Sequence, residues 1–250
     1  MDEVVAALAD EHEDLRALLA TLAPADLGLP TRCRGWDVGD VVLHLAQTDA
    51  MALDSVSGRF PRTPGSWAET GPPASVDEGA AAMVAAERGA DPGAVVARWS
   101  RAAAALDTAL GAMDLSTRVP WVAGELSART LATTRLAETW IHGGDVAGAL
   151  GATQAPSPRL RHVARLAWRT LPYAFARAGR VQAGPVAFHL TAPDGGRWDF
   201  VPDDEPRTTV RGPALDLCQV AARRLPAAST ALVAEGPDAA DVLELVRTYA

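Results

Sequence analysis

The sequence contains no lysine, and all 23 of its basic residues are arginine. Without a lysine amine, the chain has no group for a Schiff-base or lysine-base mechanism. It has only two cysteines, Cys33 and Cys218, far apart and in different motifs, so neither a disulfide framework nor a paired-thiolate zinc site is predicted. We expect both thiols to be reduced and structural. The preference for arginine and alanine is typical of GC-rich genomes such as those of actinobacteria.

Several functional signatures are also missing. The chain has no GxSxG or CxxC motif, no glycine-rich phosphate loop and therefore no obvious nucleophile of its own. No apolar run approaches the ~20 residues of a membrane span, and the acidic start MDEVVAALADEHEDL does not resemble a targeting peptide. A net charge of −8 argues against nucleic-acid binding. We expect a soluble, cytoplasmic protein, monomeric or homodimeric, that binds neither nucleic acid nor membranes.

The first 150 residues carry helical periodicity, and 48% hydrophobic residues suffice for a core. Asp37 and Ser127 are positioned as N-caps of two of the predicted helices. The glycine- and proline-rich stretch 57–78 predicts an extended surface connection that shapes a substrate mouth, and Pro120, Trp121 and Gly124 predict another loop. The helices predicted for a bundle cover residues 3–22, 37–53, 79–88, 92–113 and 127–150.

After a proline-containing linker at 151–160, the pattern changes. A helix over 158–178 is interrupted near Pro172, and residues 186–200 alternate as in a two-stranded hairpin with its turn at 194–196. Two further strands and two helices are predicted at 208–211, 213–224, 230–235 and 238–249. The fold class is therefore α+β, with a helical domain over 1–155 and a small α+β domain over 156–250.

Polar residues recur on the helix 127–150. Arg135, Glu138, His142 and Asp145 follow one another at helical spacing on a face where neighbouring apolar residues predict the bundle interior. Glu138 and His142 are four residues apart, so their side chains can share one ion. Buried charges need a partner or a metal, which favours a metal site. The stripe is equally compatible with a solvated face, and His142 with a core histidine bonded to a backbone carbonyl.

His44 lies at the border of the apolar face of the helix 37–53. Alone, it is more typical of a histidine satisfied at a helix border. Together with Glu138 and His142 it completes a His/His/Glu set, the ligand set of catalytic zinc with an open fourth position. His12 falls on the apolar stripe of the first helix and either borders the same interior or is structural.

The segments PTRCRGWDVGDVVLHLAQTD and ETWIHGGDVAGALG resemble the DinB-like metalloenzyme superfamily, specifically its mycothiol-dependent maleylpyruvate isomerase branch. TVRGPALDLCQVAARR resembles the small α+β domain that follows the bundle in that branch. The resemblance spans nearly the whole chain. It implies an N-terminal DinB-like four-helix bundle, a bound Zn²⁺ or other divalent metal, and mycothiol as cosubstrate.

The resemblance also assigns residues. The family's metal ligands correspond to His44, Glu138 and His142. Its arginine from the C-terminal domain corresponds best to Arg224, with Arg223 as a one-residue alternative, and we expect Arg224 to act in catalysis and cofactor binding. An arginine at a helix end, held there by the helix dipole, is the structural alternative. Asp145 is expected to orient His142 or act as a base, unless it is an exposed helix carboxylate.

These expectations favour a zinc-dependent thiol S-transferase or isomerase that acts on a small electrophilic metabolite with a low-molecular-weight thiol. Two alternatives stay open. One is metal-assisted hydrolysis or another small-molecule reaction without thiol, which the same open site would support. The other is a non-catalytic small-molecule-binding protein.

Overall fold

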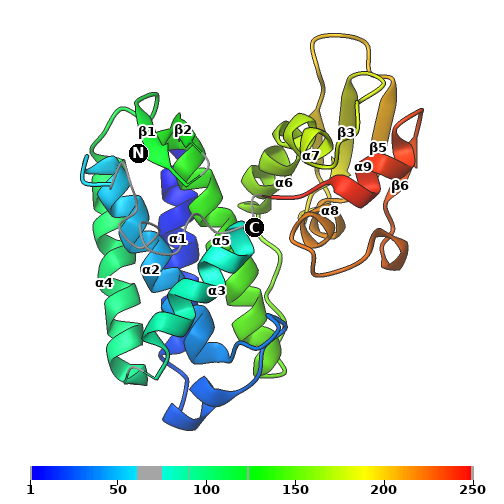
Figure 1. Ribbon diagram of the computed structural model, residues 1–250. Coiled ribbons are helices and arrows are strands. Elements are labelled where there is room, and N and C mark those ends of the chain that lie inside the picture. The colour runs from blue at the N-terminus through cyan, green and yellow to red at the C-terminus, as the bar shows by residue number, and fades with distance from the viewer. Residues whose placement is uncertain (1, 61–74, 90, 123, 249–250) are drawn as a thin grey trace. The chain divides into compact units, whose positions relative to one another are not determined.

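The computed structural model describes residues 2–60, 75–89, 91–122 and 124–248 (Figure 1). Contacts between Cα atoms divide the chain into two compact units, Met1–Gln154 and Ala155–Ala250. The first unit is helical apart from a small hairpin, whereas the second carries a four-stranded sheet, so the predicted α+β class is confirmed. None of the helices in the described ranges combines the length and hydrophobicity needed to cross a membrane.

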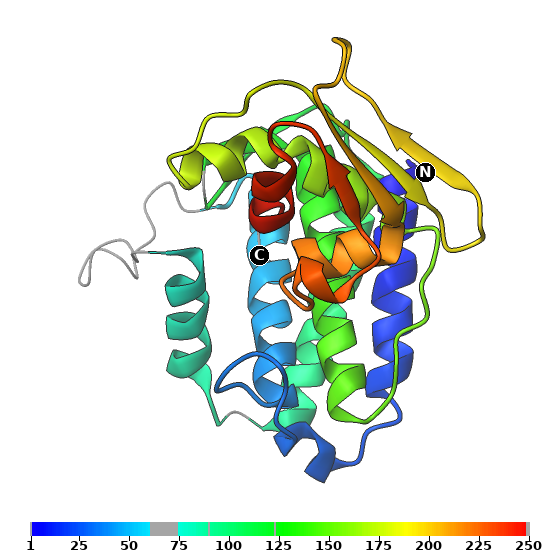
Figure 2. The same ribbon diagram turned by 90° about the vertical axis from the view of Figure 1, so that its right-hand side faces the viewer.

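Four long helices build the first unit. Each packs against two others: α1 and α2 both contact α4 and α5. Figure 2 shows α1 (blue) and α5 (green) side by side. Most of the interior is apolar and includes Leu8, Val42, Leu106 and Leu136, all with no exposed area. The four helices are α1 (Glu3–Leu19), α2 (Val38–Val56), α4 (Pro92–Gly111) and α5 (Ala128–Ala149).

The helix starts agree with the predicted caps. The Asp37 carboxylate accepts a hydrogen bond from the backbone N–H of Asp40, whose own carboxylate accepts one from Asp37, a capping box that fixes the start of α2. Ser127 caps α5 by accepting from the N–H of Thr130. These caps matter for the site because α2 carries His44 and α5 carries Glu138.

Two predicted connections are wrong in part. The loop expected around Pro120 is an antiparallel hairpin of β1 (Arg118–Trp121) and β2 (Gly124–Ser127). Its strands of four residues are too short to show a clear alternation. The connection expected over 57–78 ends earlier, because α3 (Val76–Glu87) starts with Ser75 as its N-cap. Residues 61–74 of that connection lie outside the described residues.

The second unit combines helices with one four-stranded sheet, whose strands lie in the order β4-β3-β5-β6. The predicted hairpin is confirmed: β3 and β4 pair antiparallel, with Phe188 opposite Phe200. The helix predicted over 158–178 breaks into two, and Pro172 stands in the first turn of the second. The elements are α6 (Leu160–Arg169), α7 (Leu171–Arg177), β3 (Val186–Thr191), β4 (Arg197–Phe200), β5 (Thr208–Pro213), α8 (Ala214–Ala221), β6 (Val233–Glu235) and α9 (Ala239–Leu245).

Candidate metal centre

The polar stripe of α5 is buried. Arg135, His142 and Asp145 are 2%, 7% and 1% exposed, and the Glu138 side chain is 16% exposed. The interpretation of this stripe as a solvated face is therefore wrong, and so is that of Asp145 as an exposed carboxylate. His44 on α2 is also buried. Each of these groups must find a partner inside the protein.

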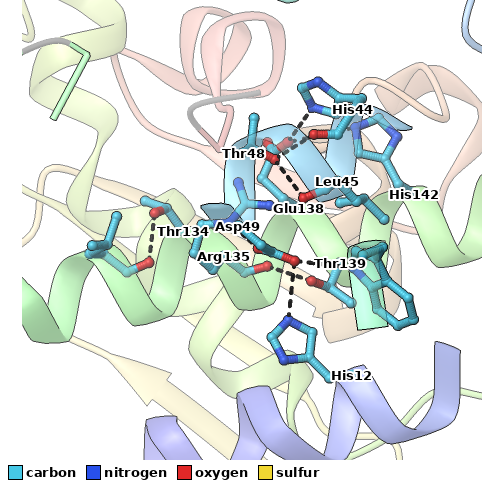
Figure 3. A network of polar contacts seen from close by, with 12 residues as sticks. His12, His44, Leu45, Thr48, Asp49, Thr134, Arg135, Glu138, Thr139 and His142 are labelled. Atoms are coloured by element: carbon cyan, nitrogen blue, oxygen red, sulfur yellow. Dashed lines mark hydrogen bonds and ion pairs between the residues drawn. The ribbon is translucent and has the colours of Figure 1, made fainter. Parts of the chain in front are cut away.

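The three candidate ligands converge. Nε2 of His44 lies 3.3 Å from Oε2 of Glu138, and Nε2 of His142 lies 3.6 Å from the same oxygen. The two imidazole rings are 5.1 Å apart at an angle of 75°. One ligand atom from each of the three residues lies within 4.8 Å of the others. Figure 3 shows the three side chains gathered between α2 and α5.

These separations fit a metal ion. Ligand atoms held about 2.0–2.1 Å from a tetrahedral zinc lie about 3.3 Å from one another. The two nitrogen–oxygen distances are close to that value and longer than most hydrogen bonds between such groups. Two imidazoles and one carboxylate suit zinc and leave a fourth position for a thiol, water or substrate.

The same arrangement sets the protonation states. Burial lowers the pKa of His44, which favours the neutral ring. Burial alone would raise the pKa of Glu138, but hydrogen bonds with His142 and His44 hold it well below its usual range. Burial would also lower the pKa of His142, yet hydrogen bonds with Asp145, Cys33 and Glu138 hold that pKa well above its usual value. The raised pKa favours the protonated form of His142, and a divalent cation would compete with that second proton for the ring.

Asp145 fixes the orientation of His142. Its Oδ2 lies 3.0 Å from Nδ1 of His142, one helical turn earlier. With Nδ1–H donating to this carboxylate, Nε2 faces Glu138 and can bind a metal ion once the ring is neutral. The geometry matches one of the two roles predicted for Asp145, that of orienting the histidine.

Cys33, which we expected to be structural only, contacts two residues of the candidate site. Its Sγ donates to Oδ2 of Asp145 at 3.3 Å and lies 3.8 Å from Nδ1 of His142. A cysteine in a loop has no periodicity from which such contacts could be predicted. The feature of the sequence that could have placed Cys33 near the site is its position in the CRGW segment, which leads into the helix of His44.

The loop before α2 also brings an aromatic ring close to the two candidate histidine ligands. The ring of Trp36 is 5.2 Å from that of His44 and 6.5 Å from that of His142. The backbone N–H of Trp36 donates to the carbonyl of Cys33 at 2.9 Å, and Gly35 between them has a φ of +79°. This tight turn, which needs glycine, brings Cys33 and Trp36 to the same centre.

Beyond His142, two glycines allow a close chain approach. A Cβ at Gly144 would lie 3.1 Å from the side-chain oxygen of Gln154, and one at Gly143 would lie 3.7 Å from its nitrogen. Gln154 is held there by donating to the buried carboxylate of Glu11 on α1 at 2.8 Å. The Gln154 side chain thus lies against α5 directly after the candidate ligand His142.

His12 is not placed with the ligands. It is fully buried, and its ring nitrogens face Asp107 at 2.9 Å and Asp49 at 3.7 Å. Of the two roles considered for His12, the structure therefore shows the structural one.

Arg223 and Arg224 follow α8 in the second unit. Arg223 adopts a left-handed backbone with a φ of +59°, and its Nη1 donates to the carbonyl of Glu244 at 3.1 Å. The half-buried Arg224 donates from Nη1 to the carbonyl of Ala222 at 2.8 Å. Both contacts lie within the second unit, and the predicted action of Arg224 at the metal stays a prediction.

Comparison with known proteins agrees with the two-part organisation. Residues 8–147 match the mycothiol maleylpyruvate isomerase N-terminal domain, and residues 160–240 match the MDMPI C-terminal domain. The first match contains all three candidate ligands.

Full-length relatives extend this similarity. Two uncharacterized proteins from strains of Mycobacterium tuberculosis are each 34% identical over 248 residues, covering 98% of this chain and 95% of the relative. The crystal structure of the mycothiol-dependent maleylpyruvate isomerase has the same fold, with a TM-score of 0.61 and 20% identity over 95% of each chain. A mutant of that isomerase matches with the same score. The chain belongs to the mycothiol maleylpyruvate isomerase family.

Proposed function

We propose that this chain is a metal-dependent enzyme, with zinc as its ion, that isomerises or conjugates a small electrophile with the help of mycothiol. The observation that supports the metal is the convergence of His44, His142 and Glu138 on one point. Membership of the family supports the thiol and the isomerase chemistry.

In this proposal, His44, Glu138 and His142 hold the ion. A bound divalent cation lowers the pKa of a coordinated thiol or water and polarises a carbonyl oxygen. Asp145 keeps a proton on Nδ1 of His142, so that Nε2 stays free to bind. Trp36 shields the two histidine rings from water. The low local dielectric strengthens every charge interaction at the site.

The reaction needs no nucleophile from the protein. A bound mycothiol would supply a thiolate that can add reversibly to a carbon–carbon double bond conjugated to a carbonyl. Addition would make that bond single and free to rotate, and loss of the same thiolate would restore the double bond, which is an isomerisation without net consumption of thiol. If a proton added to the neighbouring carbon instead, the carbon–sulfur bond would remain and the product would be a conjugate.

We assign Arg224 a supporting role in this chemistry. By analogy with the family, its guanidinium supplies a charge-assisted hydrogen bond to a carboxylate or carbonyl oxygen of mycothiol or substrate. This assignment rests on the resemblance of the segment TVRGPALDLCQVAARR to the family's C-terminal domain.

The deciding experiment has two steps. Elemental analysis of the purified protein should find close to one equivalent of divalent metal. Candidate electrophiles are then assayed with and without mycothiol at constant metal occupancy, and we expect turnover only with the thiol. Turnover that is indifferent to thiol would favour a metal-assisted hydrolase. Ligand binding without metal or turnover would favour a non-catalytic binding protein.

A further inference from the structure

A second polar cluster lies inside the bundle, separate from the three ligands. All four long helices, α1, α2, α4 and α5, contribute side chains to this cluster, and the carboxylate of Asp49 lies at its centre (Figure 3). Oδ1 of Asp49 accepts from Nε of Arg135 at 2.8 Å, and Oδ2 accepts from Nε1 of Trp99 at 3.1 Å. Nε2 of His12 lies 3.7 Å from Oδ2, and its Nδ1 meets Asp107.

This cluster is more deeply buried than the metal ligands. Asp49, His12 and Trp99 have no exposed area, and Arg135 is 2% exposed. Within the described part of the chain, Nε2 of His12 and Nη2 of Arg135 have no hydrogen-bond partner. Buried ion pairs that are incompletely satisfied stabilise a fold no better than apolar residues of similar volume. The cluster is therefore poorly explained as a source of stability.

Its location suggests what it does supply. Asp49 lies five residues after His44 on α2, and Arg135 lies three residues before Glu138 on α5. At about 1.5 Å of rise per residue, these offsets are about 7.5 Å and 4.5 Å along the helix axes. The Asp49–Arg135 pair and the His44–Glu138 contact thus join the same two helices about one turn apart.

Directional contacts fix register better than apolar ones. The apolar side chains between helices attract without a preferred direction, so they tolerate a small slide or rotation. A hydrogen-bonded ion pair weakens steeply when its angle or distance changes. A slide of α2 along α5 would break the Asp49–Arg135 pair in the interior, where neither charge could turn to water.

We propose that Asp49 and Arg135 are positioning residues for the metal centre: their buried ion pair sets the register of α2 against α5 and so places His44 opposite Glu138 and His142. Trp99 and His12 hold the Asp49 carboxylate in place from α4 and α1. The inference rests on the proposed metal site, because it concerns the geometry of that site.

The test uses full-length protein and cobalt(II), whose visible spectrum reports the number and geometry of its ligands. In the double variant Asp49→Leu/Arg135→Met both charges are removed, so neither is left buried alone. We expect it to bind cobalt(II) at least about tenfold more weakly than the wild type, as found when groups supporting metal ligands are lost, and with altered absorption bands. Leu106→Ala is the control, because it destabilises the bundle core without removing a charged group of either pair.

The outcomes separate positioning from stability. Leu106→Ala should lower the unfolding temperature but keep the wild-type cobalt spectrum and affinity. If the double variant does the same, the inference is wrong. If it fails to fold, Asp49→Asn/Arg135→Met replaces it: this variant also removes both charges and the contact between the two positions, but keeps an acceptor for Nε1–H of Trp99. Wild-type binding by that variant again overturns the inference. A wild-type protein that binds no cobalt(II) would instead contradict the metal site itself.

Discussion

Oδ2 of Asp145 lies 3.0 Å from Nδ1 of His142, and the thiol of Cys33 donates to the same Oδ2. Asp145→Ala should therefore leave the bundle folded but weaken metal binding by about 10–100-fold, since His142 loses the partner that fixes its ring. Competition titration with a chromophoric zinc chelator measures the change. Asp10→Ala removes an exposed carboxylate of α1 and should leave the affinity unchanged. Equal affinity of both variants would contradict the orienting role.

The ligands themselves are tested by removal. His44→Ala or His142→Ala should abolish the bound metal, because two remaining ligands cannot hold zinc tightly. His189→Ala serves as the control, as His189 lies on β3 and pairs with Asp199. Elemental analysis after dialysis gives the occupancy of each variant. Full occupancy in either ligand variant would refute the assignment.

Stability should depend on pH differently with and without metal. The pKa of His142 is raised in the fold, so its proton stabilises the metal-free protein below the unfolded value of 6.5, and that contribution is lost as the pH rises through the folded pKa. The lowered pKa of Glu138 has the opposite effect. Its ionised carboxylate stabilises the fold above the unfolded pKa of 4.5, and this stabilisation is lost as the pH falls through the folded pKa.

The metal-free protein should therefore lose stability on the alkaline side, whereas the metal-saturated protein should not, because the cation replaces the proton on His142. Unfolding temperatures between about pH 5 and 9, with chelator or with zinc, measure both curves. In His142→Gln the alkaline loss should disappear. Parallel curves for the two wild-type forms would contradict this account.

Arg224→Ala should spare metal binding and reduce turnover. Loss of one charged hydrogen bond costs about 1.5–3 kcal/mol, and the loss should appear mainly as weaker saturation by mycothiol or substrate. Arg223→Ala is the matched control, since the Arg223 side chain bonds to the carbonyl of Glu244. Steady-state kinetics of both variants at equal metal occupancy decide between them. If only Arg223→Ala reduced turnover, Arg223 rather than Arg224 would correspond to the family's arginine.

The two thiols should differ in reactivity. Cys218 has no exposed area, and burial raises the pKa of its thiol, so it should resist alkylation until the protein unfolds. Cys33 is half-buried and should react in the native state. Mass spectrometry after timed treatment with iodoacetamide counts the labels, and Cys33→Ser should remove the native one. Equal labelling rates would show that the second unit opens around Cys218.

Much of this fold could be predicted from local rules. Asp37 and Ser127 marked the starts of α2 and α5 because capping depends only on residues close in sequence. The spacing of Glu138 and His142 placed both on one helix face. The composition of a His/His/Glu ligand set and the family resemblance both joined His44 to them, and the structure places it beside them.

What the sequence could not supply depends on tertiary contacts. Cys33 reaches Asp145 across 112 positions, and Asp49 reaches Arg135 across 86, so no periodicity could pair them. The hairpin of β1 and β2 was missed because its strands are short and contain Pro120.

The residue allowed at position 144 of α5 depends on the residue at position 154. Gly148 has nothing within 4 Å of an added Cβ, whereas at Gly144 the side chain of Gln154, held by Glu11, stands in the way. Alanine at 148 should gain about 0.5–1 kcal/mol of helix stability, but at 144 that gain meets a steric cost. A side chain at position 144 requires the end of the residue 154 side chain to shift by a few tenths of an ångström, or a smaller residue there. Across related sequences these two positions should vary together, although ten residues separate them and neither binds the metal.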